Sequence, residues 1–173
     1  IEFMDKIIDA GVTVFKIEGR ARSAEYVKTV ARCYRDAADA VLAGKYTPEY
    51  ASELKERLST VFNRGFWDGY YQGARLGEWS EVYGNKATKS KKYIGKVTNY
   101  FSNIGVAEIL IETGSISVGD NVIIIGPSTG VVEVTVEEIR VDLKSTESAV
   151  KGEYCSIAVP EKLRRSDKLY LFQ

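Results

Sequence analysis

The chain has 173 residues, of which 45% are hydrophobic, and its 24 basic and 24 acidic residues leave no net charge. This length accommodates one or two domains of about 100–200 residues each. The neutral balance is unlike the overall basic character of a nucleic-acid-binding protein, and the absence of histidine excludes a cysteine–histidine nucleophile and a histidine-ligated metal site.

The first elements are predicted to be a helix, a strand and a second helix. The apolar residues between Phe3 and Ile8 have helical spacing that stops at Gly11. Val12–Ile17 then predicts a strand buried in a parallel sheet. Because such a strand needs covered faces and neighbours, we expect most of its sheet to lie upstream and the chain to be a fragment.

Two longer helices are expected next. Ser23 is a candidate N-cap for a helix with a wide apolar stripe that ends at Gly44. Thr47 and Pro48 mark a second helix start, with threonine as the cap and proline at the first helical position. We expect this helix to stop at Asn63–Gly65.

From Tyr93 onward the apolar period changes to two and β-branched residues dominate. Turn residues separate six predicted strands, and closure into a small antiparallel barrel would remove exposed strand edges. The predicted strands are 93–101, 105–112, 120–125, 130–140, 153–159 and 168–172. The fold class is therefore α+β, with residues 1–75 forming one domain, 76–91 a linker and 92–173 the β domain.

Two sets of residues carry a resemblance to a known family. Phe15–Arg20 is followed by Ser23–Val27, and Val61–Phe66 by Gly69 and Tyr70. Together these blocks resemble the C-terminal part of the peptidase U32 family, the collagenase-like peptidases. The resemblance implies that residues 1–75 are the last strand and helices of a parallel β/α barrel. The β domain is similar, by its turn spacing, to the second-domain barrel of translation elongation factors and to the C-terminal domain of these peptidases. The residues of this likeness are Gly95, Ala107–Ile109, Ile116–Asp120, Val150–Gly152 and Arg165–Leu169.

The resemblance leaves the activity open between three classes. The parent is either a protease or an enzyme that hydroxylates transfer or ribosomal RNA, or else the chain is a stand-alone binding module. Some relatives carry an iron–sulfur cluster, but we expect no cofactor in this chain. We expect the chain alone to be catalytically silent, because one strand end cannot assemble a barrel active site.

The partners implied are the missing N-terminal catalytic domain and either a peptide or protein substrate or an RNA. No membrane partner is expected, and the sequence shows neither a signal-peptide pattern nor an apolar run of about 20 residues. We expect a cytoplasmic location.

A first candidate site lies where the predicted strand meets the helix. Charged side chains there, together with free backbone amides, would bind an anionic group of the substrate. The candidate residues are Glu18, Arg20, Arg22, Asn63 and Arg64. The alternative is that Arg20 pairs with Glu18 and Arg22 with Glu25, which would only fix the turn.

A second candidate site is a lysine-rich segment without acids between residues 86 and 96, whereas residues 105–161 are strongly acidic. Lysines around an aromatic ring suit phosphate contacts whose affinity falls with salt. The candidate residues are Lys86, Lys89, Lys91, Lys92, Tyr93 and Lys96. The alternative is a solvated linker and a strand edge protected by lysines.

Two further features have structural alternatives. The aromatic segment from Phe66 to Tyr71 either stacks unpaired bases or packs between domains. Cys33 and Cys155 lie on apolar faces of a predicted helix and strand. We expect both cysteines to be small buried hydrophobic residues.

Overall fold

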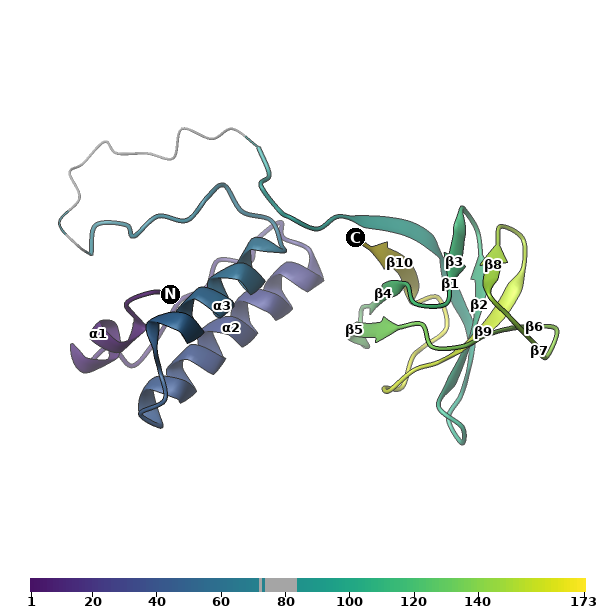
Figure 1. Ribbon diagram of the computed structural model, residues 1–173, viewed down its shortest axis with the longest axis horizontal. Coiled ribbons are helices and arrows are strands. Elements are labelled where there is room, and N and C mark those ends of the chain that lie inside the picture. The colour runs from purple at the N-terminus through teal and green to yellow at the C-terminus, as the bar shows by residue number, and fades with distance from the viewer. Residues whose placement is uncertain (72, 74–83) are drawn as a thin grey trace. The chain divides into compact units, whose positions relative to one another are not determined.

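The computed structural model describes residues 1–71, 73 and 84–173 (Figure 1). The chain divides into two compact units, residues 1–89 and 90–173, which we call the helical unit and the β unit. The first half of the expected linker at 76–91, residues 76–83, lies outside the described residues.

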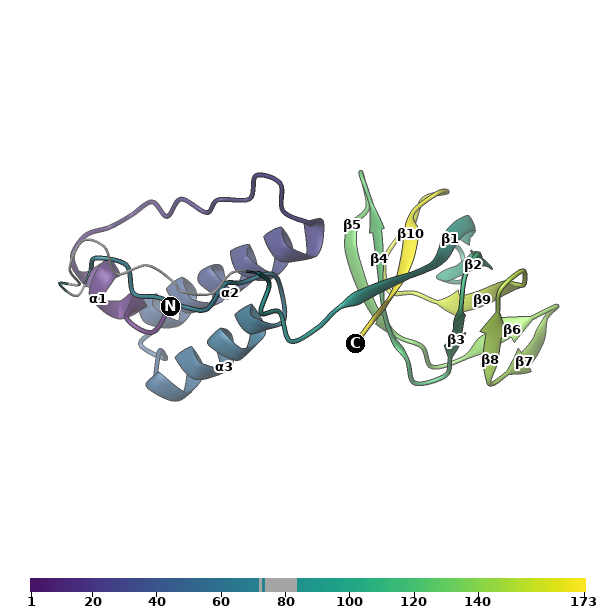
Figure 2. The ribbon, with the colours of Figure 1, turned by 90° about the horizontal axis from the view of Figure 1, so that it is seen from above.

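The helical unit is built on two helices that lie side by side (Figures 1 and 2). Its helices are α1 (Met4–Asp9), α2 (Ala24–Leu42) and α3 (Pro48–Ser59). The predicted helices are confirmed, because the apolar stripes of α2 and α3 face one core that contains Cys33, Ala37 and Leu54. Among the described helices, none combines the length and the low polarity that a membrane crossing requires.

The helix starts agree only partly with the expected caps. Oγ1 of Thr47 accepts a hydrogen bond of 3.2 Å from the backbone N–H of Tyr50, so the predicted cap of α3 is confirmed. Ser23 occupies the N-cap position of α2 with extended backbone angles, but its side chain makes no capping hydrogen bond. That part of the prediction is wrong, and α2 depends instead on the packing of its apolar face.

The buried strand expected at Val12–Ile17 is not formed. The segment is extended, yet the part of the chain that the structure describes offers it no partner strand. Its apolar side chains are exposed, and Val14 is 81% exposed. The prediction of a buried strand is therefore wrong for the described residues, because a strand needs a neighbour to hydrogen-bond with.

The β unit contains ten strands among the described residues, which form an eight-stranded antiparallel sheet and a two-stranded sheet. The strands are β1 (Lys91–Phe101), β2 (Val106–Ile111), β3 (Ser115–Ser117), β4 (Asn121–Gly126), β5 (Gly130–Thr135), β6 (Ile139–Val141), β7 (Lys144–Thr146), β8 (Ser148–Val150), β9 (Tyr154–Ala158) and β10 (Lys168–Phe172). The large sheet has the order β5-β4-β10-β1-β2-β9-β6-β7, and β3 pairs with β8. Figure 1 shows the long β1 beside both β2 and β10.

The six predicted strands all have counterparts, but the number six is wrong. The segment expected as one strand at 130–140 is divided into β5 and β6, and β3, β7 and β8 were not predicted. Residues from both sheets share one core, since Ile116 of β3 and Ala149 of β8 are fully buried with the residues of the large sheet. In the described part of the chain, the outer strands β5 and β7 do not pair with each other.

The turn between β6 and β7 has an unusual residue at its tip. Val141 pairs with Lys144, so only Asp142 and Leu143 form the turn. Their φ angles are 49° and 64°, in the left-handed region that suits asparagine and glycine in such turns. Leu143 is also 90% exposed, so burial of its side chain offsets little of the strain in the backbone.

We expect Leu143→Gly to stabilise the β unit by about 0.5–1 kcal/mol, because a left-handed non-glycine residue costs about 1–2 kcal/mol and the entropy of glycine offsets part of the gain. Urea unfolding followed by circular dichroism measures the difference. Leu143→Ala is the matched control, since it removes the exposed side chain but keeps the Cβ atom that strains the turn. An equal gain from both variants would contradict the explanation.

Candidate functional site

The residues of the first candidate site begin in a tight turn before α2. The backbone N–H of Arg22 donates to the carbonyl oxygen of Gly19 at 3.1 Å, and Ala21 has a left-handed φ of 55°. Oε1 of Glu18 accepts a hydrogen bond of 2.6 Å from the backbone N–H of Arg20. Glu18 therefore bonds the backbone of this turn.

The Arg22 guanidinium does not stay in the turn but lies over an aromatic ring. Its Cζ atom is 3.9 Å from the ring centre of Phe62 and 5.8 Å from that of Tyr26. Cζ of Arg64 lies 6.0 Å from the same Phe62 ring. The structure thus brings Arg22 and Arg64, predicted from separate parts of the chain, to one ring.

Asn63, which precedes Arg64, fixes the loop that carries Arg64. Oδ1 of Asn63 accepts from the backbone N–H of Gly65 at 3.1 Å, and its Nδ2 donates to the carbonyl oxygens of Ser59 and Val61. These bonds occupy both ends of the amide side chain. Asn63 therefore shapes the loop, a role that the sequence did not indicate.

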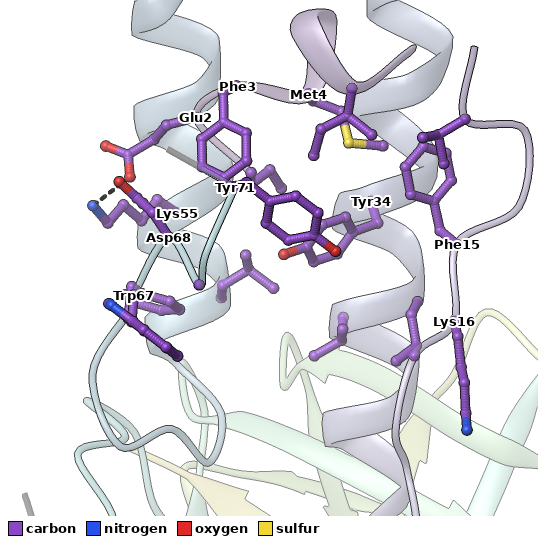
Figure 3. Close-up of a pocket in the computed structure, with 18 of the residues that line it drawn as sticks. Glu2, Phe3, Met4, Phe15, Lys16, Tyr34, Lys55, Trp67, Asp68 and Tyr71 are labelled. Carbon is purple, nitrogen blue, oxygen red and sulfur yellow. Dashed lines mark hydrogen bonds and ion pairs between the residues drawn. The ribbon is translucent and has the colours of Figure 1, made fainter. Parts of the chain in front are cut away.

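A cavity of about 620 Å³ lies in the helical unit, beside the extended segment (Figure 3). Most of its wall is apolar or aromatic. The lining residues are Ile1, Glu2, Phe3, Met4, Ile7, Val12, Val14, Phe15, Lys16, Ile17, Val30, Tyr34, Lys55, Leu58, Phe66, Trp67, Asp68, Gly69 and Tyr71. We call this cavity the aromatic groove.

Figure 3 shows how the rings lie in the aromatic groove. Tyr71 and Tyr34 point toward each other between the helices, and Phe3 lies 6.1 Å from Tyr71 between ring centres. Trp67 packs edge-on against Tyr70 at 5.1 Å, yet Trp67 remains 50% exposed and Tyr71 79% exposed. The predicted aromatic segment thus presents open ring faces.

The predicted lysine site is divided between the two units. Lys86 and Lys89 belong to the helical unit, whereas Lys91, Lys92 and Lys96 lie on β1 of the β unit with Tyr93. Within the helical unit, the backbone N–H of Lys86 donates to the carbonyl oxygen of Asn63 at 2.8 Å. A Cβ atom at Gly65 would lie 4.0 Å from Nζ of Lys86, so this lysine lies beside the Arg64 loop.

Lys91 and Lys96 belong to a cluster of polar and aromatic side chains from β1, β10 and Glu112, the residue after β2. The Tyr93 hydroxyl donates to Oε2 of Glu112, and Nζ of Lys96 lies 2.7 Å from Oε1 of the same carboxylate. Tyr93 packs edge-on against Tyr170 at 5.6 Å, and Nζ of Lys91 lies 5.1 Å from the Tyr170 ring centre. We call this the Tyr93 cluster.

The charges of the Tyr93 cluster shift two pKa values in opposite directions. The hydrogen bond to Glu112, with burial and the carboxylate charge, raises the pKa of Tyr93 to about 12. The hydrogen bonds from Lys96 and Tyr93 lower the pKa of Glu112. The contribution of Tyr93 to stability is therefore present below pH 10 and is lost as pH rises through about 12, while that of Glu112 is lost as pH falls below 4.5.

We expect Glu112→Gln to lower the pKa of Tyr93 from about 12 toward 10, because the substitution removes the negative charge and the strong acceptor. Chemical-shift titration of ¹³Cζ-labelled tyrosine measures the change at Tyr93. Glu108→Gln is the control, since Oε1 of Glu108 accepts from the Thr98 hydroxyl instead. A Tyr93 pKa that stays near 12 in Glu112→Gln would contradict the assignment.

No pattern in the sequence indicated that Glu112 and Tyr170 belong to the second site. Both residues reach Tyr93 from other strand segments, and only the register that pairs Tyr93 with Tyr170 reveals the contact. The alternation of side chains along β10 predicts that Tyr170 shares a face with Lys168. It does not predict that Tyr170 lies opposite Tyr93.

The two cysteines do not fit an iron–sulfur cluster, which needs several thiolate ligands. Cys33 and Cys155 are both buried, as predicted, and lie in the separate apolar cores of the two units. Burial raises the pKa of Cys33, and it raises the pKa of Cys155 to about 12. Burial therefore disfavours the thiolate form that ligation and nucleophilic attack require.

Comparison with known sequences connects the chain to one family. The profile of peptidase family U32 matches residues 1–81. A Porphyromonas gingivalis protein named collagenase is 56% identical over 172 residues, which are 99% of this chain and 42% of that protein. A Haemophilus influenzae protein named tRNA hydroxylation protein P is 26% identical over 166 residues, which are 94% of this chain and 35% of that protein.

The chain thus spans less than half the length of these relatives. Among solved structures, the C-terminal domain of a U32 peptidase from Geobacillus thermoleovorans matches with a TM-score of 0.43 and 19% identity. That match covers 45% of this chain and 96% of the solved domain.

Proposed function

Because the chain belongs to peptidase family U32, we propose that it is the C-terminal accessory region of a collagenase-like protease, where it binds extended protein substrates without cleaving them. The observation that carries this proposal is the 56% identity over 172 residues with the Porphyromonas gingivalis collagenase. Collagen-type chains adopt the polyproline II conformation, and such peptides dock into aromatic-lined grooves. The aromatic groove supplies suitable rings from Phe15, Trp67 and Tyr71.

In this proposal residues 1–75 complete a parallel β/α barrel of the parent protein. Support comes from Val12–Ile17, whose exposed apolar side chains and extended backbone suit a strand that pairs with strands outside the chain. The charged turn with Glu18 and Arg20 would then lie at the carboxyl end of that strand, where such barrels place their active sites. Since one strand end supplies only part of such a site, the chain alone is inactive.

Residues 92–173 act in this proposal as a closed β-barrel domain, joined by a linker at 76–91. The shared burial of Ile116 and Ala149 with the large sheet supports closure, because it places both sheets around one core. Closure would also protect the edges of β5 and β7 from pairing with other chains. The Tyr93 cluster is the surface through which this domain would contact its partner.

Calorimetric titration of the chain with a proline-rich collagen-type peptide tests the substrate role, with the same mixture analysed by chromatography for cleavage. We expect binding without cleavage, and about tenfold weaker binding for Trp67→Ala, because a central aromatic contact is typically worth more than about 1 kcal/mol. Tyr154→Ala is the control, since Tyr154 is an exposed tyrosine of the β unit. Cleavage by the chain alone, or unchanged binding in Trp67→Ala, would overturn the proposal.

A second candidate function is a role in RNA hydroxylation, with the lysine-rich segment as the RNA contact. The relation to the Haemophilus influenzae tRNA hydroxylation protein favours this candidate, and so do the lysines beside the exposed part of β1. Substituting Lys89, Lys91 and Lys92 with glutamate should abolish salt-dependent binding of transfer RNA in a mobility-shift assay. Unchanged RNA binding in this variant would remove the lysine assignment.

A further inference from the structure

A second cavity of the helical unit has the features of a small-molecule site. It encloses about 330 Å³, at the lower end of the 300–1,000 Å³ typical of such sites. The start of α2, the end of α3 and the loop after α3 form its walls. The lining residues are Arg22, Tyr26, Val30, Tyr34, Leu58, Phe62, Asn63, Arg64, Gly65 and Phe66. We call this cavity the arginine cleft.

The charges at the arginine cleft are all of one sign. Its described lining includes two arginines and no acidic residue. Both guanidinium groups approach the ring of Phe62, with Cζ of Arg22 at 3.9 Å and Cζ of Arg64 at 6.0 Å from the ring centre. A carboxylate or phosphate has the charge and the paired oxygens that complement guanidinium groups.

The stacked position of Arg22 suits anion binding. A guanidinium held over an aromatic ring can still bind a carboxylate or phosphate through its N–H groups. Stacking between Phe62 and Tyr26 also restricts the side chain. Less conformational entropy is then lost when the ligand binds.

Lys86 adds a third cation at the rim. Its backbone N–H bonds Asn63, and its Nζ would lie 4.0 Å from a Cβ atom at Gly65, which lines the arginine cleft. Asn85 also holds this loop, because its Oδ1 accepts hydrogen bonds from the backbone N–H groups of Asn63 and Ala87. Hydrogen bonds between the Asn63 and Asn85 segments therefore hold Arg64 and Lys86 in place.

The turn before α2 carries backbone strain. Ala21 has a left-handed φ of 55°, a conformation that costs a non-glycine residue about 1–2 kcal/mol. Such strain clusters at ligand-binding positions, where the surrounding structure maintains it. Here it lies directly before Arg22, the residue stacked in the arginine cleft.

We propose that the arginine cleft binds a small organic oxyanion. The carboxylate or phosphate group is held by Arg22, Arg64 and Lys86, and a flat apolar body packs against Tyr26 and Leu58. Glu18 and Arg20 do not line the arginine cleft and take no part in this binding. The peptide-binding role proposed above concerns the aromatic groove, a different cavity, although Val30, Tyr34, Leu58 and Phe66 line both.

Titrations of the ¹⁵N-labelled chain with four probes test the proposal by amide chemical shifts. The probes are benzoate, phenyl phosphate, inorganic phosphate and benzyl alcohol. We expect benzoate and phenyl phosphate to shift the amides of residues 62–65, and each should bind at least tenfold more tightly than benzyl alcohol. The tighter of the two aromatic probes identifies the preferred acidic group. Equal binding of benzyl alcohol would overturn the anion assignment, and equal binding of inorganic phosphate would overturn the apolar part of the site.

Variants assign the binding to the arginines. Arg22→Gln and Arg64→Gln should each weaken the binding of benzoate and phenyl phosphate at least tenfold. Arg22→Lys should weaken binding less than Arg22→Gln, because lysine keeps the positive charge although it lacks the planar guanidinium. Arg35→Gln is the matched control, since Arg35 is an exposed α2 arginine whose Nη2 lies 2.7 Å from Oδ1 of Asp39. The amide spectrum of each variant reports whether it is folded. Unchanged affinity in folded Arg22→Gln and Arg64→Gln would overturn the proposal.

Discussion

Replacing Gly95 with alanine is expected to destabilise the β unit by more than about 3 kcal/mol, at the upper end of overpacking costs. Gly95 lies on β1, between its pairing partners Leu169 on β10 and Ile111 on β2. A Cβ atom there would lie 2.0 Å from the carbonyl oxygen of Leu110 and 3.2 Å from Cα of Ile111. These are backbone atoms of the neighbouring strand, so no side-chain rotation can relieve the clash.

Hydrogen exchange measures this effect within the β unit, where a single unfolding transition for the whole chain cannot be assumed. The amide of Ile111, which donates to the carbonyl oxygen of Glu153 at 3.0 Å, is a suitable reporter. Gly152→Ala is the control, because nothing lies within 4 Å of its Cβ position and its left-handed φ of 95° costs only about 1–2 kcal/mol. Similar losses of protection in both variants would contradict the steric argument.

Gly126→Ala is expected to cost about 2–3 kcal/mol, and here the clash is with a side chain. The new Cβ atom would lie 1.8 Å from Oδ1 of Asp167, a carboxylate that is only 2% exposed. That carboxylate is fixed, because Oδ2 accepts from the Thr129 hydroxyl at 2.6 Å and from the backbone N–H of Arg164 at 2.8 Å. The carboxylate cannot move away without losing these hydrogen bonds.

A double-mutant cycle distinguishes this clash from a general effect of alanine. Asp167→Ala alone should cost about 1–3 kcal/mol, because it leaves the N–H of Arg164 and the Thr129 hydroxyl without their acceptor. In that background Gly126→Ala should cost at least about 1 kcal/mol less than in the unmodified chain, since the clashing atoms are gone. Additive losses in the cycle, measured by hydrogen exchange in the β unit, would contradict the predicted contact.

The sequence predicted best the elements whose signals are local. Thr47 and Pro48 marked the start of α3. The apolar run of β4 and the alternating residues of β10, each with flanking turns, marked these two strands. The three-residue strands β3 and β8 were missed because they are too short to show a period. They exist through pairing of Ser115 with Val150, which are far apart in the chain.

Contacts between distant segments also limited the prediction of the sites. Arg22, Arg64 and Lys86 were each noted from local composition, but as members of two separate sites. Hydrogen bonds between the Asn63 and Asn85 regions bring them together, and no local pattern encodes that pairing. The Val12–Ile17 segment shows the opposite limit, because its apolar run indicated an extended backbone but could not indicate whether a neighbour was present.

That extended segment has a practical consequence for any preparation of this chain. Val12–Ile17 presents apolar side chains together with backbone donors and acceptors that have no strand partner among the described residues, so it is a template on which a second copy can add a strand. Self-association through it would rise with concentration and fall in dilute solution. Titrations of either cavity of the helical unit are therefore best repeated at several protein concentrations.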